Sequence, residues 1–224
     1  NGHATDRRAP GGWIARTDSL GSFWEIYSSG YRNSYDIAFN QLGELFTFDS
    51  DMEWDLGMPW YRPVRVCHVT SGSEFGWRTG SGKWPKYYPD NLPGILELGQ
   101  GSPTGIVSAA ASHFPPPYNG GLIVCDWSFG TMYHIKLQSS GASFTATASE
   151  FLNGVPLPLT DVTFGAEGAM YFTTGGRRLE SGLYRVWSNK NDQKKEKETA
   201  SKKLKLRRLL DTFHDTSLIA DYDL

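Results

Sequence analysis

Four carboxylates stand at every second position of one short stretch, and their spacing is the most direct sign of chemistry in this sequence. They are Asp49, Asp51, Glu53 and Asp55. In an extended chain, alternate side chains point to the same side about 7 Å apart. Hard cations such as calcium bind carboxylate oxygens, so the stretch predicts a metal site. The alternative is a solvated acidic loop that is neutralised by nearby arginines, for which the candidates are Arg62, Arg65 and Arg78.

An arginine and an asparagine precede the strand that leads into this acidic stretch. Arg32 offers paired donors to a carboxylate, and Asn33 adds both a donor and an acceptor. These residue types suit a site for a ligand that carries carboxylate groups. The alternative is that Arg32 pairs with the acidic loop itself.

A hairpin pattern that occurs twice must position these residues. Each copy has a short alternating strand, a Gly-containing turn and a second alternating strand: Asp36–Phe39, Gly43 and Glu44–Thr47 in the first, and Asp161–Phe164, Gly168 and Ala169–Thr173 in the second. Hairpins of this kind cannot bury their faces alone, so they indicate stacked repeats. The sequence therefore predicts an all-β fold, with a β-propeller as the natural candidate.

A second repeated phrase, a glycine followed by an alternating strand, predicts a later strand in each blade. It occurs at Gly12–Arg16, Gly130–Ile135 and Gly182–Val186. We expect the end of one blade at about 11–17, and blades at about 31–77, 104–148 and 158–187. Four to eight blades close a propeller, so we expect a partial propeller over residues 1–187 whose upstream blades are its missing partners.

The composition changes after Trp187. Residues 188–203 are polar and charged, which predicts a linker, and residues 204–224 contain apolar residues at helical spacing, which predicts the start of a helical, HEAT-like domain. Residues 189–208 carry nine basic and three acidic side chains. A basic run can bind nucleic acid, but the interspersed acids favour a solvated linker, and no nucleic-acid partner is expected.

The remaining reactive side chains give weaker signals. Cys67 and Cys125 lie in apolar strands, which favours buried free thiols over a disulfide. His68 is expected in the core, whereas His113 and His134 are expected in a loop and at the surface. The sequence contains no GxSxG, HExxH or Walker pattern, and no apolar run long enough to span a bilayer.

Several phrases resemble the soluble quinoprotein glucose/sorbosone dehydrogenases, which are six-bladed propellers of the TolB-like type. The phrases are GYRNSYDIAF, the acidic loop after it and EFGW, and the closer likeness over about 11–187, through PWYRPVRVCHV, CDWSFGTMY and SGLYRV, is to membrane-bound dehydrogenases (PVC-type haem-binding) of planctomycete-type bacteria. The resemblance implies oxidation of a sugar or alcohol with pyrroloquinoline quinone (PQQ) and calcium. It also implies a c-type haem in another segment of the parent protein, and a periplasmic or cell-envelope location.

The resemblance also implies roles for particular residues. Arg32 and Asn33 match the family's cofactor contacts, and the acidic loop matches its calcium-associated loop. The family's general base is a histidine on an earlier blade, so no catalytic residue is assigned here, and this chain alone is expected to be inactive. The segment 157–161 lacks the arginines that the family has before a late strand, and Arg177 and Arg178 are expected on the opposite side, out of reach. A non-catalytic propeller that binds a carbohydrate or protein partner is the competing hypothesis.

Overall fold

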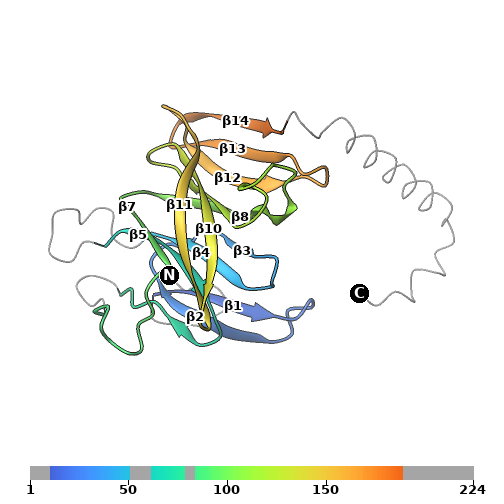
Figure 1. Ribbon diagram of the computed structural model, residues 1–224. Coiled ribbons are helices and arrows are strands. Elements are labelled where there is room, and N and C mark those ends of the chain that lie inside the picture. Colours follow the sequence, from blue (N-terminus) through green and yellow to red (C-terminus); the bar gives the residue numbers. More distant parts are fainter. Residues whose placement is uncertain (1–10, 51–61, 79–83, 189–224) are drawn as a thin grey trace, which may run out of the picture.

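The chain folds into four β-sheets, and apart from β6 their strands follow one another along the sequence (Figure 1). A computed structural model describes residues 11–50, 62–78 and 84–188. The first sheet contains β1 (Gly12–Thr17), β2 (Trp24–Tyr31) and β6 (Ser73–Glu74), and the second contains β3 (Ile37–Phe39), β4 (Leu45–Asp49), β5 (Val64–Val69) and β7 (Leu96–Gly99). The third contains β8 (Pro103–Ser108), β9 (Leu122–Asp126), β10 (Thr131–Ser140) and β11 (Ser143–Asn153), and the fourth contains β12 (Leu159–Phe164), β13 (Met170–Gly176) and β14 (Leu179–Val186). A short 3-10 helix, η3 (Ala109–Ala111), follows β8.

The first strands of neighbouring sheets contact one another, which is the arrangement of propeller blades. β8 lies against β3 on one side and against β12 on the other. In the second and third sheets the other strands then follow outward in chain order. The predicted all-β, partial propeller is thus confirmed.

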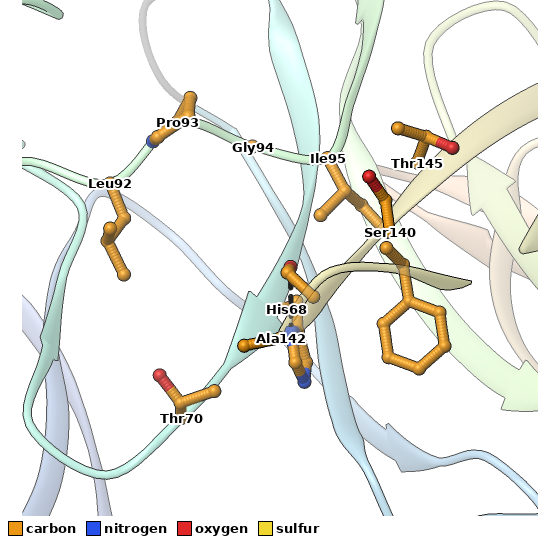
Figure 2. A pocket seen from close by; sticks show the side chains of 11 residues that line it. His68, Thr70, Leu92, Pro93, Gly94, Ile95, Ser140, Ala142 and Thr145 are labelled. Atoms are coloured by element: carbon orange, nitrogen blue, oxygen red, sulfur yellow. Dashed lines mark hydrogen bonds between the residues drawn. The ribbon is translucent and has the colours of Figure 1, made fainter. Parts of the chain in front are cut away.

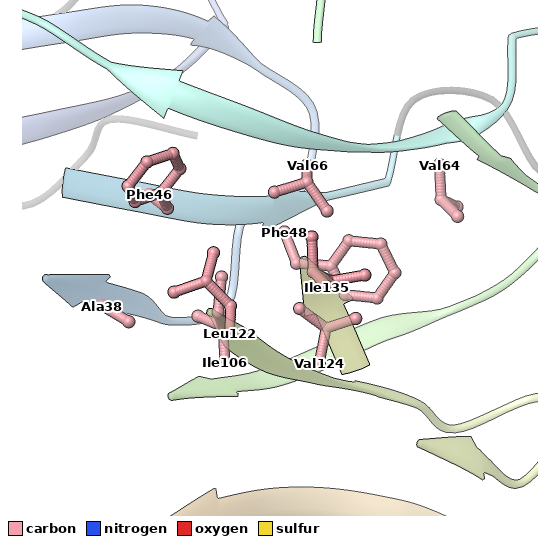
Figure 3. Packing of buried hydrophobic residues seen from close by; sticks show 9 residues of the cluster. All are labelled: Ala38, Phe46, Phe48, Val64, Val66, Ile106, Leu122, Val124 and Ile135. Carbon is pink, nitrogen blue, oxygen red and sulfur yellow. The ribbon is translucent and has the colours of Figure 1, made fainter. Parts of the chain in front are cut away.

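Apolar side chains between neighbouring blades hold the fold together. The cluster between the second and third sheets contains Phe46 and Phe48 of β4 and Ile135 of β10, all fully buried (Figure 3). A second cluster joins the third and fourth sheets, and a third joins the first and second. Because both faces of the second sheet are covered, β4 and β5 are buried along their whole length. Burying one Phe or Ile side chain stabilises the fold by about 1.5–3 kcal/mol, so the blades depend on their neighbours for stability.

The two hairpins predicted from the repeated pattern are present and have the same turn. In the first, the amide of Gly43 donates to the carbonyl of Asn40 at 3.0 Å, and in the second Gly168 donates to Gly165 at 2.8 Å. Both turn glycines have a positive φ, +81° at Gly43 and +75° at Gly168, which a residue with a Cβ rarely adopts. The glycine in each copy therefore sets the hairpin's register.

The predicted blade limits differ from those observed. The blade expected at about 31–77 has other limits: β6, near its predicted end, pairs in parallel with β2 of the first sheet, and β7 completes the second blade instead. β2, β7 and β11 were not predicted. His134, expected at the surface, is buried, and its Nε2 lies 2.8 Å from the carbonyl of Gly120. The predicted linker, from residue 189 onward, and the predicted helical segment lie outside the described residues. In the part of the chain that the structure describes, no helix is long and apolar enough to cross a membrane.

Each blade has two distinct ends. The turns that join first and second strands, at 40–44, 109–121 and 165–169, lie at what we call the turn end. The second strands run away from these turns and finish at the other end, which we call the Asp49 end after the last residue of β4.

Candidate functional site

Asp49 is the centre of the hydrogen-bond network at the Asp49 end. Its side chain is fully buried, and its Oδ1 accepts bonds from the amide of Asn33 at 3.0 Å and from the hydroxyl of Ser34 at 3.2 Å. Its Oδ2 accepts from Nη2 of Arg65 at 3.1 Å and, more weakly, from the amide of Arg32 at 3.4 Å. Asp49 thus ties the β2–β3 connection to the end of β4.

Arg65 neutralises this carboxylate inside the protein. Its side chain is 6% exposed and that of Asp49 is 0% exposed, so the ion pair is shielded from solvent. Arg65 also donates from Nη1 to the carbonyl of Phe75 at 3.0 Å, and its guanidinium lies over the Phe75 ring. Because removing one partner of a buried pair leaves an uncompensated charge, we expect both residues to be needed for stability.

The structure places Arg32 and Asn33 beside Asp49, the first residue of the acidic stretch. Arg32 is half-buried, and its Nη1 donates to Oγ of Ser50 at 2.9 Å. Asn33 is exposed, and its backbone amide holds the corner while its side chain lies at the surface. A cationic and an amide side chain are therefore presented at the Asp49 end; their role as cofactor contacts stays a prediction.

Asp126 occupies the same place in the next blade. It ends β9 as Asp49 ends β4, it is buried, and its Oδ1 accepts bonds from the amides of Ser102 at 3.0 Å and Ser128 at 2.9 Å. Burial raises the pKa of the Asp126 carboxyl, although the amide bonds oppose the shift. Thr174 stands at the corresponding position of β13. An aspartate at the fifth residue of the second strand thus fixes the chain in two neighbouring blades. The sequence shows this repeat in the segments LFTFD and LIVCD.

The predicted metal site is only partly within the described residues. Asp51, Glu53 and Asp55 lie outside them. Both oxygens of Asp49 are already engaged by donors and by Arg65, which is one of the three arginines proposed to neutralise the loop. Another of the three, Arg78, pairs with Glu74 at 2.9 Å. In the described part of the chain, no group of three or more His, Cys, Asp or Glu side chains could hold a metal ion.

Arg177 and Arg178 lie at the Asp49 end, and their expected place on the opposite side is wrong. The amide of Gly175 donates to the carbonyl of Pro158 at 3.0 Å, so the β13–β14 turn lies beside the segment that precedes β12. Both arginines have a positive φ, +49° and +67°, which is unusual for residues with a Cβ. The guanidinium of Arg177 lies 5.1 Å from the centroid of the Trp127 ring, and Nε1 of Trp127 donates to Gly175. The antiparallel pairing of β12 with β13 decides this placement.

The three described histidines lie away from the Asp49 end. His68 stands near the end of β5, where Glu44 contacts it from the β3–β4 turn. The amide of His113 donates to the carbonyl of Gly168 in the β12–β13 turn, and His134 bonds to Gly120 just before β9. All three are therefore at the turn end. Cys67 and Cys125, in neighbouring blades, are both buried thiols and neither is in a disulfide, as predicted.

Comparisons with solved structures find the same fold in sugar dehydrogenases. The PQQ-bound form of aldose sugar dehydrogenase from Streptomyces coelicolor matches 81% of this chain and 53% of its own length, with 19% identity and a TM-score of 0.58. An oxidoreductase described as a glucose dehydrogenase, from Thermus thermophilus, matches 72% of this chain and 47% of its own, with 21% identity and a TM-score of 0.57. The apo form of the soluble aldose sugar dehydrogenase from Escherichia coli matches at 17% identity over 72% of this chain and 46% of its own, with a TM-score of 0.52.

These matches show a shared propeller fold. The chain spans about half the length of the solved structures that it matches. No protein-family model and no curated protein matches the sequence.

Proposed function

We propose that this chain is part of a PQQ-dependent sugar or alcohol dehydrogenase, with the cofactor held at the Asp49 end. The observation that carries the proposal is the Arg32–Asn33 corner, which Asp49 fixes in a propeller whose fold matches a PQQ-bound aldose sugar dehydrogenase. The proposal extends that likeness from fold to activity.

The residues at this end fit the cofactor in type. PQQ is a planar tricarboxylate and therefore needs cationic donors. Arg32 supplies a half-buried guanidinium, and Asn33 supplies an exposed amide. Arg177 and Arg178 add two further guanidinium groups at the same end of the fourth blade, which compensates for the arginines absent from 157–161. A guanidinium binds a carboxylate through two parallel bonds, so it orients such a ligand as well as attracting it.

Each part of the chain would have a defined task. The bound quinone would accept the hydride from the substrate's carbon, which is the chemistry that the cofactor supplies. Arg32 would hold a carboxylate, Asn33 would donate or accept beside it, and Asp49 with Arg65 would keep both in place. The described histidines lie at the turn end, so the proposal assigns the general base to another segment of the parent protein.

Calcium and the parent's other features complete the proposal. The calcium site would draw on Asp51, Glu53 and Asp55, because Asp49 already accepts four bonds. A c-type haem in another segment would take the electrons, and the location would be periplasmic or at the cell envelope. These three points, like the planctomycete-type membrane-bound dehydrogenase branch, rest on the sequence resemblance.

Further blades of the same protein are the partner that the uncovered faces favour. On β3, Phe39 is 60% exposed and Ile37 is 44% exposed. On the fourth sheet, Leu183 of β14 is 71% exposed. Apolar residues of this size are normally covered within a propeller, so blades outside this sequence would pack there.

A titration of the full-length parent protein with PQQ tests the proposal. A charge-assisted bond is worth about 1.5–3 kcal/mol, so Arg32→Ala should weaken PQQ affinity by about 10- to 150-fold, measured by the change in quinone absorbance. Arg16→Ala is the control, because Arg16 is an exposed arginine paired with Glu25 on the first sheet. Unchanged affinity in Arg32→Ala refutes the site. If the parent binds no quinone at micromolar concentration and reduces no dye with sugar, the non-catalytic propeller replaces the dehydrogenase.

A further inference from the structure

A cavity at the turn end lies between the second blade and the tip of the β10–β11 hairpin. It has a volume of about 550 Å³. One wall is the chain segment from Leu92 to Ile95, and the other is the hairpin tip from Ser140 to Thr145, with His68 and Thr70 between them (Figure 2). In the register of β4 with β5, Phe46 lies opposite His68, and Asp49 lies opposite Arg65, three residues further along β4. The cavity therefore begins about 10 Å along the strands from Asp49.

Three side chains form a chain of hydrogen bonds at this cavity. Oγ of Ser143 lies 3.0 Å from Nδ1 of His68, and Nε2 of His68 lies 3.0 Å from Oε2 of Glu44. A carboxylate can only accept, so Nε2 of the neutral imidazole carries the proton. Nδ1 is then an acceptor for the Ser143 hydroxyl. Serine, histidine and glutamate thus stand in the order of nucleophile, base and orienting acid.

The fold holds the imidazole in one orientation. The His68 ring stacks on Phe46, with centroids 5.1 Å apart, and meets the edge of Phe144 at 5.1 Å. The side chain of His68 is 5% exposed, whereas that of Glu44 is 47% exposed. Ser143 is half-buried and lines the cavity, so its hydroxyl is open to a small molecule.

The three residues come from separate parts of the chain, which only the tertiary fold brings together. Glu44 belongs to the β3–β4 turn and His68 to β5. Ser143 follows a two-residue turn at the tip of a hairpin whose strands have ten and eleven residues, and this length carries the tip across to the second blade. Shorter strands would leave the tip over its own blade.

We propose that Ser143, His68 and Glu44 form a hydrolytic site for small esters, separate from the Asp49 end. His68 takes the proton of Ser143 as Oγ bonds to the ester carbonyl carbon. The carbon–oxygen bond to the leaving alcohol then breaks, and His68 returns the proton to that oxygen. Water then gives a proton to His68 as its oxygen bonds to the acyl carbon; the bond from that carbon to Oγ breaks, the acid leaves, and His68 returns the proton to Oγ of Ser143. Thr70, Ser140 and Thr145 line the same cavity, and their hydroxyls would be the side-chain donors for the developing oxyanion.

Labelling with a fluorophosphonate, which forms a stable bond with activated serines, tests the site. Mass spectrometry of the labelled full chain should place the adduct on Ser143, and Ser143→Ala should remove it. Since a general base contributes about 10²–10⁴-fold, His68→Gln should slow labelling by that factor. Ser139→Ala is the matched control, because Ser139 is an exposed serine on the same hairpin outside the cavity.

Glu44 is a positioning residue, and its test separates orientation from folding. Glu44→Gln should slow labelling at least about tenfold while the unfolding midpoint stays close to that of the wild type, because the side chain is half exposed. Glu44→Asp, which keeps the charge, should recover part of the rate. If Ser143 reacts no faster than Ser139, or if its labelling is unchanged in His68→Gln protein that is still folded by circular dichroism, the hydrolytic site does not exist.

Discussion

Replacing Asp49 by alanine tests whether this residue is a structural anchor or a metal ligand. The substitution removes the carboxylate that pairs with the buried guanidinium of Arg65, and it removes the acceptor for the amide of Asn33. Breaking a buried ion pair from one side costs about 3–5 kcal/mol. For a domain of this size, 1 kcal/mol corresponds to a shift in melting temperature of about 2–4 °C. Asp49→Ala should therefore melt about 6–20 °C below the wild type.

The measurement is thermal unfolding by circular dichroism, with calcium and with a chelator. Asp126→Ala is the matched control, because Asp126 is equally buried and accepts backbone amides, but has no ion pair among the described residues. It should lose only about 1–3 kcal/mol, the desolvation cost of unpaired groups. If Asp49 were instead a calcium ligand, calcium would stabilise the wild type by about 2.7 kcal/mol at one hundred times its Kd and would leave the variant unchanged. A loss at Asp49 no larger than that at Asp126, or one seen only with calcium, refutes the anchor.

Three further predictions follow from packing and burial. Gly30→Ala should lower the free energy of unfolding, measured in urea, far more than Gly43→Ala. Both glycines have a positive φ, which costs a residue with a Cβ about 1–2 kcal/mol, but at Gly30 the Cβ would also overlap the Glu74 carboxylate and lie 2.6 Å from the amide of Gly76. Equal losses would contradict the close packing of β2 and β6. A thiol reagent should modify neither Cys67 nor Cys125 within minutes in the folded protein, and it should modify both in denaturant. Both thiols are buried, and burial raises the pKa of Cys125. Rapid modification of the folded protein would show that the blades open. Burial raises the pKa of Asp126 in the folded state, so folding favours the neutral carboxyl. The stability of the wild type relative to Asp126→Asn should therefore rise as the pH falls from 7 toward 4, measured by urea unfolding at each pH. A constant difference would contradict the raised pKa.

Much of the fold could be predicted because the signals are local. Alternation of apolar and polar side chains, with a glycine at the turn, identifies the β3–β4 and β12–β13 hairpins from a dozen residues each. The apolar runs around Cys67 and Cys125 predict burial for the same reason. A turn position with a positive φ favours glycine, so a glycine at that position in the sequence indicates the turn directly.

The partners of the site residues could not be read in this way. Asp49 has three further carboxylates at regular spacing after it, which favoured a metal site, yet its partner in the structure is Arg65 of the neighbouring strand. The equivalence of Asp49 and Asp126 was visible in the sequence, and it would have indicated the structural role. Arg177 and Arg178 were misplaced because the end of a blade at which a turn lies depends on strand pairing.

The sequence by itself determined that the chain forms repeated hairpins with buried thiols and a polar corner at Arg32 and Asn33. The tertiary structure alone decided that β6 joins the first sheet in parallel, and that Ser143 meets His68 across 75 residues. The physical reason is that hairpin formation depends on neighbouring residues, whereas contacts between blades depend on which surfaces the whole fold buries together. Such contacts carry no signature in the spacing of residues along the chain.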